Sequence, residues 1–207
     1  PEIAQAAPVI SQTLRTPSNV RVRNVATLGG HLAHADPHMD LPPVLIALRA
    51  TLTISGPSGE RRLNVADLFA GYLETTLAPG ELITQVIVPA QGPRRVAYLK
   101  CTTRSADDWP ALGLAVSLET SGQEITAARI AIGAATETPR RLAGAESALA
   151  GTRAADADLG AAGDAAAAEA DIKADAQGSA AYKRELLRVY VGRAVRQALS
   201  RKSGRGG

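Results

Sequence analysis

Three strand patterns in a row, followed by three helical patterns, constrain the fold of this chain more than any other feature of its sequence. The strand patterns lie at residues 95–102, 112–119 and 125–132. The helical patterns follow a change to alanine-rich composition after Pro139, and they lie near residues 140–150, 153–170 and 180–201. Strands grouped together and helices grouped after them are typical of the α+β class. We therefore expect a three-stranded antiparallel sheet with a helical layer.

A separate part of the fold precedes the turn-rich segment that contains Pro89, Gly92 and Pro93. Prolines and glycines so close together mark a boundary, and we expect domains over residues 1–90 and 94–202. The first domain mixes both kinds of pattern, with helices expected over 1–14, from Pro42 onwards and around Phe69, and strands over 51–55 and 82–88. Residues 203–207 have nothing to bury, so we expect a disordered tail.

Charge and composition argue against several kinds of partner. The chain has 23 basic and 20 acidic residues, a formal net charge of +3 and 3% aromatic residues. Nucleic-acid binding needs a basic surface or aromatic stacking platforms, so we expect no nucleic-acid partner. The sequence contains no apolar run as long as a membrane span and no signal-peptide pattern. We therefore expect no membrane span and a cytoplasmic location.

Cys101 is the one cysteine in the sequence. A single thiol cannot form an internal disulfide, and it cannot supply the four thiolates that an iron–sulfur cluster normally needs. Any cluster that works with this protein must therefore belong to another chain, and we expect Cys101 to be a packed, inert thiol.

The segment that begins at Thr27 carries the residues most suited to binding a ligand. Adjacent glycines at Gly29 and Gly30 let backbone amides approach a phosphate closely, and Thr27 offers a hydroxyl. A glycine pair between apolar segments is also typical of an ordinary turn, so the spacing alone leaves both interpretations open. Asp36 and Asp40 are candidates for binding ligand hydroxyls or for capping the helix that follows.

Three histidines in the same segment introduce the alternative of a metal site. His31, His34 and His38 lie close to two aspartates, and imidazole and carboxylate are ligands of zinc and iron. The cluster has no cysteine and no histidine pair fixed four residues apart on one helix, so its spacing specifies no coordination geometry. We expect no metal.

Motifs along nearly the whole chain follow the order found in one known family. They are Arg23-Asn24, Thr27-Leu28-Gly29-Gly30-His31-Leu32-Ala33, Ala35-Asp36-Pro37, Asp40-Leu41-Pro42-Pro43, and the segments 69–77, 80–83, 88–89, 98–100, 104–110 and 175–184. In this order they resemble the FAD-binding (medium) subunits of the molybdenum hydroxylases. That family includes xanthine dehydrogenases and aerobic carbon monoxide dehydrogenases.

The resemblance implies that residues 1–90 form the second lobe of a PCMH/vanillyl-alcohol-oxidase-type FAD domain. It implies FAD contacts at Thr27, Leu28, Gly29, Gly30, His31, Asp40, Ile83, Lys100 and Asp107. The first five of these residues would cradle the diphosphate of FAD. The family usually has a small polar residue, often asparagine, where this chain has His31, and an imidazole N–H can still donate to phosphate.

The other four residues would contact the remainder of the FAD. The family implies that Asp40 accepts hydrogen bonds from ribose or ribityl hydroxyls and that the backbone of Ile83 touches the flavin moiety. Lys100 would reach a carbonyl oxygen of the isoalloxazine ring, where a cation stabilises the negative charge of the reduced flavin. Asp107 lies in a loop expected near the ring. Trp109 in the same loop either packs on the ring or belongs to the core.

The family also implies cofactors on partner chains. A large subunit would hold molybdopterin and oxidise the substrate, and a small subunit would hold two [2Fe–2S] clusters that pass electrons to this FAD. NAD, a quinone or oxygen would then accept the electrons, and the expected assembly is a dimer of heterotrimers. Two alternatives are a non-catalytic assembly module that binds no flavin and a free-standing FAD oxidase.

Family members begin with about sixty to eighty further residues, which include an earlier Gly-Gly phosphate loop. No such loop occurs in this sequence. We therefore expect the sequence to be part of a longer subunit, with half of the diphosphate clamp outside it.

Overall fold

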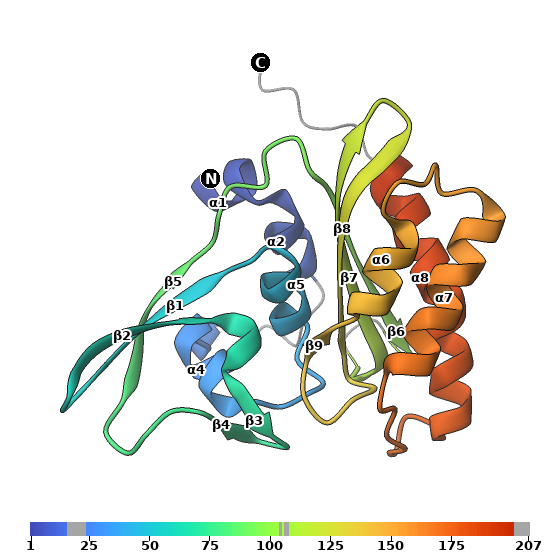
Figure 1. Cartoon of the computed structure of the whole chain (residues 1–207). Coiled ribbons are helices and arrows are strands. Elements are labelled where there is room, and N and C mark those ends of the chain that lie inside the picture. The colour runs from blue at the N-terminus through green and yellow to red at the C-terminus, as the bar shows by residue number, and fades with distance from the viewer. Residues whose placement is uncertain (16–23, 104, 106–107, 201–207) are drawn as a thin grey trace.

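The computed structural model describes residues 1–15, 24–103, 105 and 108–200. Its first half contains the helices α1 (Glu2–Ala6), α2 (Pro8–Thr13), α4 (Leu28–His34), α5 (Leu41–Ala47) and the 3-10 helix η1 (Val65–Asp67). The strands of this half are β1 (Thr51–Gly56), β2 (Gly59–Asn64), β3 (Phe69–Gly71), β4 (Glu74–Thr75) and β5 (Leu82–Ile87). Figure 1 shows how the first half lies beside the second.

An antiparallel sheet of order β2-β1-β5 forms the frame of the first half. The tight connection from β1 to β2 pairs Gly56 with Gly59, and Gly59 has a φ of +107° that a side chain would disfavour. Helix α4 packs against β5, and β3 pairs with β4 in a small hairpin below them.

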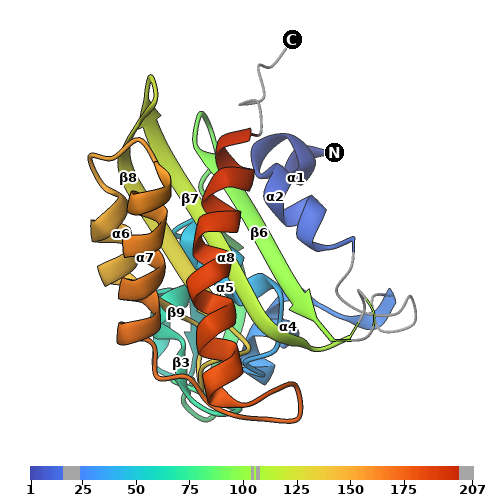
Figure 2. The same cartoon turned by 90° about the vertical axis from the view of Figure 1, so that its right-hand side faces the viewer.

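The second half is a four-stranded antiparallel sheet covered by helices. Its strands, in the order β6-β7-β8-β9, are β6 (Arg95–Thr102), β7 (Pro110–Ser121), β8 (Glu124–Gly133) and β9 (Arg140–Arg141). Its helices are α6 (Ala143–Leu149), α7 (Asp156–Glu169) and α8 (Ala180–Ser200). In Figure 2, α8 runs along β6 and β7, and α7 packs between α6 and α8.

Helix α5 lies between the two sheets, and all seven of its residues are buried. Pro42 and Pro43 fit its first turn, where their missing N–H groups have no intrahelical partner to lose. Strand β7 is consequently covered on both sides: Leu114 and Val116 face the core under α6–α8, and Ala115 faces the core around α5. The mixed α+β architecture that the sequence predicts is confirmed.

Several local predictions need correction. The single helix expected over residues 1–14 is interrupted at Ala7, with φ −143° and ψ 69°, because the residue before Pro8 disfavours the helical region. Phe69 belongs to strand β3, not to a helix. The sheet of the second half has a fourth strand, β9, which is two residues long. The predicted tail, 203–207, lies outside the described residues.

The alanine-rich segment forms α7, and one face of this helix is buried. Cys101 is partly buried against the core under the helical layer. Within the described ranges, no helix is both long enough and apolar enough to span a membrane.

Candidate functional site

The first group of predicted site residues lies at the beginning of α4. Thr27 is the N-cap residue in extended conformation, and its Oγ1 accepts a hydrogen bond from the Gly30 amide at 3.0 Å. The amides of Leu28 and Gly29 find no acceptor among the described residues. The glycine pair thus lies in the first turn of a helix and not in a tight turn. Free amides at such an end favour an anion.

Neighbouring atoms leave little room for a side chain at Gly29 or Gly30. A Cβ on Gly30 would lie 2.9 Å from Thr27 Oγ1 and would disturb the cap. A Cβ on Gly29 would lie 3.4 Å from the carbonyl oxygen of Ile83. Small residues therefore let α4 lie directly on β5, and this contact brings Ile83 beside the helix N-terminus.

His31 contributes an enclosed ring to the same group. Burial, helped by the charge of His34, lowers the pKa of His31 to about 4, so its imidazole is neutral near pH 7. Its Nε2 atom is buried without a hydrogen-bond partner in the described part of the chain. A buried polar atom normally has a partner, and a bound ligand is one way to supply it.

The second group joins α5 to β6. Asp40 is 4% exposed, and its carboxylate accepts hydrogen bonds from the Tyr98 hydroxyl at 2.6 Å and from Lys100 Nζ at 3.0 Å. Tyr98 and Lys100 lie two residues apart on one face of β6. Gly113 on β7 leaves space for the Tyr98 hydroxyl, because a Cβ there would lie 2.7 Å from it.

Burial raises the pKa of Asp40, and the hydrogen bonds from Tyr98 and Lys100 offset only part of this effect. Burial and the nearby Asp40 charge raise the pKa of Tyr98 well above its usual value. Asp40 stands at the N-cap position of α5, but its side chain makes no cap hydrogen bond. The capping alternative is therefore wrong for Asp40, whose carboxylate turns to the sheet instead.

A third cluster joins two segments that are far apart in the sequence. His38 donates from its backbone N–H to Asp36 Oδ1 at 2.8 Å, and its Nδ1 lies 3.0 Å from the same oxygen. Its Nε2 lies 2.9 Å from Asp175 Oδ2. Asp175 also accepts a hydrogen bond at 2.5 Å from Lys183 Nζ, and the Lys183 side chain is fully buried. We call these four residues the His38 network.

The His38 network suits a protonated histidine, because a carboxylate faces each ring nitrogen. Burial opposes the charge on His38, but the hydrogen bonds to Asp36 and Asp175 outweigh burial and raise the pKa of His38. The same hydrogen bonds, with that from Lys183, lower the pKa values of Asp36 and Asp175 despite their burial. Asp36 therefore closes a local turn, and it does not cap a helix.

Trp109 stacks on His38, with ring centroids 5.0 Å apart and an interplanar angle of 15°. The indole is 55% exposed, so the alternative that Trp109 belongs to the core is wrong. Asp107, which the sequence places in the same loop, lies outside the described residues. Among the residues that are described, no three potential ligands form a metal cluster.

Sequence reasoning missed Tyr98 as the partner of Asp40 and missed the link from His38 to Asp175 and Lys183. The contact between Tyr98 and Asp40 could have been predicted, since Tyr98 shares a strand face with Lys100. No sequence pattern indicates the link from His38 to Asp175, because these residues are 137 positions apart and only the folded chain brings them together.

Two family models match this chain. Residues 1–91 match the FAD binding domain in molybdopterin dehydrogenase, and residues 97–198 match the CO dehydrogenase flavoprotein C-terminal domain. The second match includes the strand that carries Tyr98 and Lys100, and the first includes α4 and Asp40.

Named relatives agree with these models. The glyceraldehyde dehydrogenase medium chain of Sulfolobus acidocaldarius is 30% identical over 94% of this chain and 69% of its own length. The nicotine 6-hydroxylase medium subunit of Paenarthrobacter nicotinovorans is 33% identical over 97% of this chain and 70% of its own length. A carbon monoxide dehydrogenase structure from Hydrogenophaga pseudoflava aligns with a TM-score of 0.92 and 32% identity, covering 97% of this chain and 70% of that one. This chain therefore belongs to the FAD-binding medium subunits of the molybdenum hydroxylases, a family of oxidoreductases.

Proposed function

We propose that this chain holds and tunes the FAD through which its complex passes electrons. Electrons would arrive from [2Fe–2S] clusters on a small partner subunit and leave to NAD, a quinone or oxygen. A large subunit with molybdopterin would oxidise the substrate. The observation that carries this proposal is the N-terminus of α4, where a threonine cap meets two amides and an imidazole nitrogen that have no hydrogen-bond partner in the described part of the chain.

The α4 group fits the diphosphate of FAD. The amides of Leu28 and Gly29 are donors for which the described segments supply no acceptor, and the helix end adds a partial positive charge. The neutral His31 ring supplies one further donor, and the carbonyl side of Ile83 lies against Gly29. In this proposal the residues from Thr27 to His31 bind and orient the diphosphate end of the cofactor, and the backbone of Ile83 contacts the flavin moiety.

The Asp40 group fits the hydroxyl-bearing and ring portions. An ionised carboxylate has about four acceptor positions, of which Tyr98 and Lys100 use two, so Asp40 can also accept from a ribose or ribityl hydroxyl. Bound FAD supplies the electron-accepting chemistry. Lys100, held by Asp40, would place its positive charge near a flavin carbonyl oxygen and favour reduction. Asp107 is proposed as a further contact, on the family resemblance alone.

The partners remain part of the same proposal. We propose a large molybdopterin subunit and a small [2Fe–2S] subunit, assembled as a dimer of heterotrimers in the cytoplasm. The named relatives are medium chains or subunits, which supports partners of this kind. The one cysteine of this sequence cannot by itself ligate an iron–sulfur cluster, which agrees with clusters on a partner subunit.

Flavin binding by the full-length subunit tests the proposal. The purified subunit is expected to be yellow and to release FAD on denaturation. Gly30→Ala, whose new Cβ would meet Thr27 Oγ1 at 2.9 Å, is expected to weaken FAD binding about tenfold through loss of a charge-assisted contact. Gly160→Ala is the matched control, because a Cβ at Gly160 meets no atom within 4 Å.

A full-length subunit that is colourless and takes up no added FAD would contradict the proposal. If such a subunit still assembled with its partners, the assembly module without flavin would be the better description. If a yellow subunit purified alone and oxidised substrate without partners, the free-standing oxidase would replace the proposed complex.

A further inference from the structure

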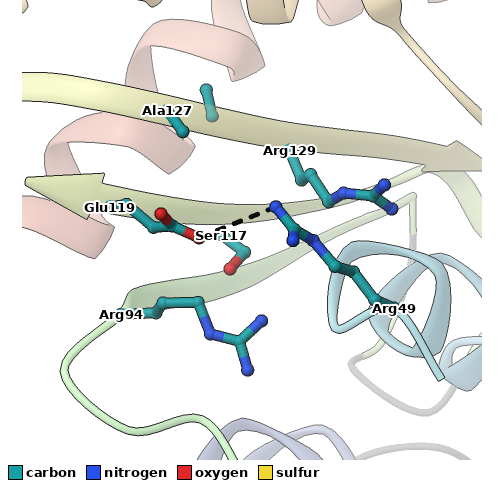
Figure 3. A pocket seen from close by; sticks show the side chains of 7 residues that line it. Arg49, Arg94, Ser117, Glu119, Ala127 and Arg129 are labelled. Atoms are coloured by element: carbon teal, nitrogen blue, oxygen red, sulfur yellow. Dashed lines mark ion pairs between the residues drawn. The ribbon is translucent and has the colours of Figure 1, made fainter. Parts of the chain in front are cut away.

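A shallow surface hollow lies far from the predicted FAD contacts, on the sheet face that α5 covers. Its lining residues are Arg49, Arg94, Ser117, Glu119, Ala127, Ala128 and Arg129. Figure 3 shows Arg49 and Arg94 extending toward Ser117 from different elements, with the guanidinium group of Arg129 beyond that of Arg49. We call this hollow the arginine pocket. Ser117 is four strand positions from Gly113, the residue paired with Lys100, which corresponds to about 13 Å along β7.

The arginine pocket has an excess of positive charge. Three arginines face a single carboxylate, Glu119, which pairs with Arg49 at a long 3.6 Å. Burial and the nearby charge of Arg49 lower the pKa of Arg94, and burial with the charges of Arg141 and Arg49 lowers the pKa of Arg129. The charges in the pocket therefore repel one another, and a bound anion relieves that repulsion.

The arginines are held in place by backbone carbonyl groups. Arg94 donates to the carbonyl oxygens of Gln91 at 3.0 Å and Ala90 at 2.6 Å, and Arg129 donates to that of Ile46 at 3.5 Å. Arg49 follows α5 with a φ of +63°, a left-handed position where glycine is the usual residue. A long charged side chain at this position carries a conformational cost.

Ser117 adds a neutral donor to the arginine pocket. The residue is 4% exposed, and its hydroxyl points into the space between Arg49 and Arg94 in Figure 3. No described residue makes a hydrogen bond with this hydroxyl. The hydroxyl can therefore donate to an oxygen-bearing ligand that also meets the surplus positive charge.

We propose that the arginine pocket binds one small oxyanion, a phosphate or carboxylate group, through the Ser117 hydroxyl and the guanidinium groups of Arg49, Arg94 and Arg129. Guanidinium groups match the geometry of both anions, and the hydroxyl donates to either. The anion comes either free from solution or as an acidic side chain of a partner subunit. This site is independent of the flavin, and its test keeps the two proposals separate.

Calorimetric titration of the full-length, FAD-loaded subunit with inorganic phosphate tests the pocket. The wild-type subunit is expected to bind one phosphate. Arg129→Gln should weaken binding about tenfold and Ser117→Ala several-fold, because each removes a donor to the anion. Arg153→Gln, at an exposed arginine outside the pocket, should leave the dissociation constant unchanged.

The same titration on the assembled complex identifies the source of the anion. A complex that binds phosphate like the isolated subunit indicates a free anion, and a complex that no longer binds it indicates a partner carboxylate in the pocket. Phosphate binding that is absent in the isolated wild-type subunit, or equal in Arg129→Gln, Ser117→Ala and wild type, would overturn the proposal. Unchanged FAD content and melting temperature show that a variant is folded. If Arg129→Gln does not fold, phosphate binding by Ser117→Ala tests the proposal instead.

Discussion

Asp40 and Lys100 form an enclosed ion pair whose stability depends on a third residue. Both side chains are at most 10% exposed, so each charge has lost most of its hydration. The pair alone leaves acceptor positions of Asp40 unfilled, and the Tyr98 hydroxyl fills one of them at 2.6 Å. Removal of one member leaves an uncompensated buried charge, which is more harmful than replacement of the whole pair.

The charge of Lys100 is expected to set the flavin potential. In the full-length subunit, Lys100→Met should lower the reduction potential by about 30 mV, which corresponds to about 1.4 kcal/mol for two electrons. The physical reason is the loss of a cation near the reduced flavin. Potentiometric titration of the bound FAD measures the effect.

Lys100→Arg keeps the charge and serves as the control. The double variant Asp40→Asn/Lys100→Met avoids an unpaired Asp40 and should show the same direction of shift as the single variant. A potential equal to that of wild type in both Met variants, with full FAD content, would rule out the proposed role of Lys100.

The elements differ in how far their sequences determine them. The helices α5, α6 and α8 and the strands β1, β5, β6, β7 and β8 follow from apolar periodicity and turn residues, and α7 follows from the helix propensity of its alanines. Strand β2 was missed because its residues are mostly polar and exposed, and its conformation comes from pairing with β1. Strand β9 is held only by β8 at Arg140 and Arg141, a contact no local pattern predicts.

Close contact between α7 and α8 leads to an element-scale prediction. A Cβ on Gly163 would lie 2.3 Å from the carbonyl oxygen of Arg188, and backbone of a packed helix cannot yield easily. Gly163→Ala is therefore expected to lower the free energy of unfolding by about 2 kcal/mol, as overpacking does. Urea unfolding of the full-length subunit measures this loss.

Gly160, in the same helix, is the matched control because its Cβ direction is open. Gly160→Ala should raise the free energy of unfolding by about 0.5–1 kcal/mol, since alanine is the better helix former. Equal effects of the two substitutions would show that helix propensity, and not the distance between the helices, controls stability here.

At the scale of the whole molecule, the sequence predicted the family but not the contacts that join the two halves of the chain. The motifs around Thr27 and Lys100 carry the resemblance, and the comparisons confirm it. The expected division at residues 90–94 stays a prediction. The link through His38, Asp175 and Lys183 depends on the folded chain, because its members come from separate segments.

The His38 network makes the stability of the molecule depend on pH. The raised pKa of His38 means that its contribution is complete below the unfolded value of about 6.5 and is lost as pH rises through the folded value. Asp36 and Asp175 have lowered pKa values, so their contribution is lost only in acid. His38→Gln should therefore cost about 2 kcal/mol at pH 6, the loss of charge-assisted hydrogen bonds, and less at pH 9.

Urea unfolding of the full-length wild type and variant at both pH values measures this difference. His34→Gln, at an exposed histidine, is the control for the substitution itself. A cost of His38→Gln that is the same at pH 6 and pH 9, or larger at pH 9, would contradict the assignment of a protonated His38.

Strand β7 contributes side chains to both hydrophobic cores of the molecule, because α5 covers one of its faces and α6–α8 cover the other. Local unfolding of either core exposes one face of β7. A substitution that destabilises the core under α6–α8 should therefore also destabilise the elements that carry Asp40 and Lys100. The backbone amides at the centre of β7 should be among the slowest in the protein to exchange with deuterium. The exchange rate of these amides therefore measures the free energy of opening of both cores at once.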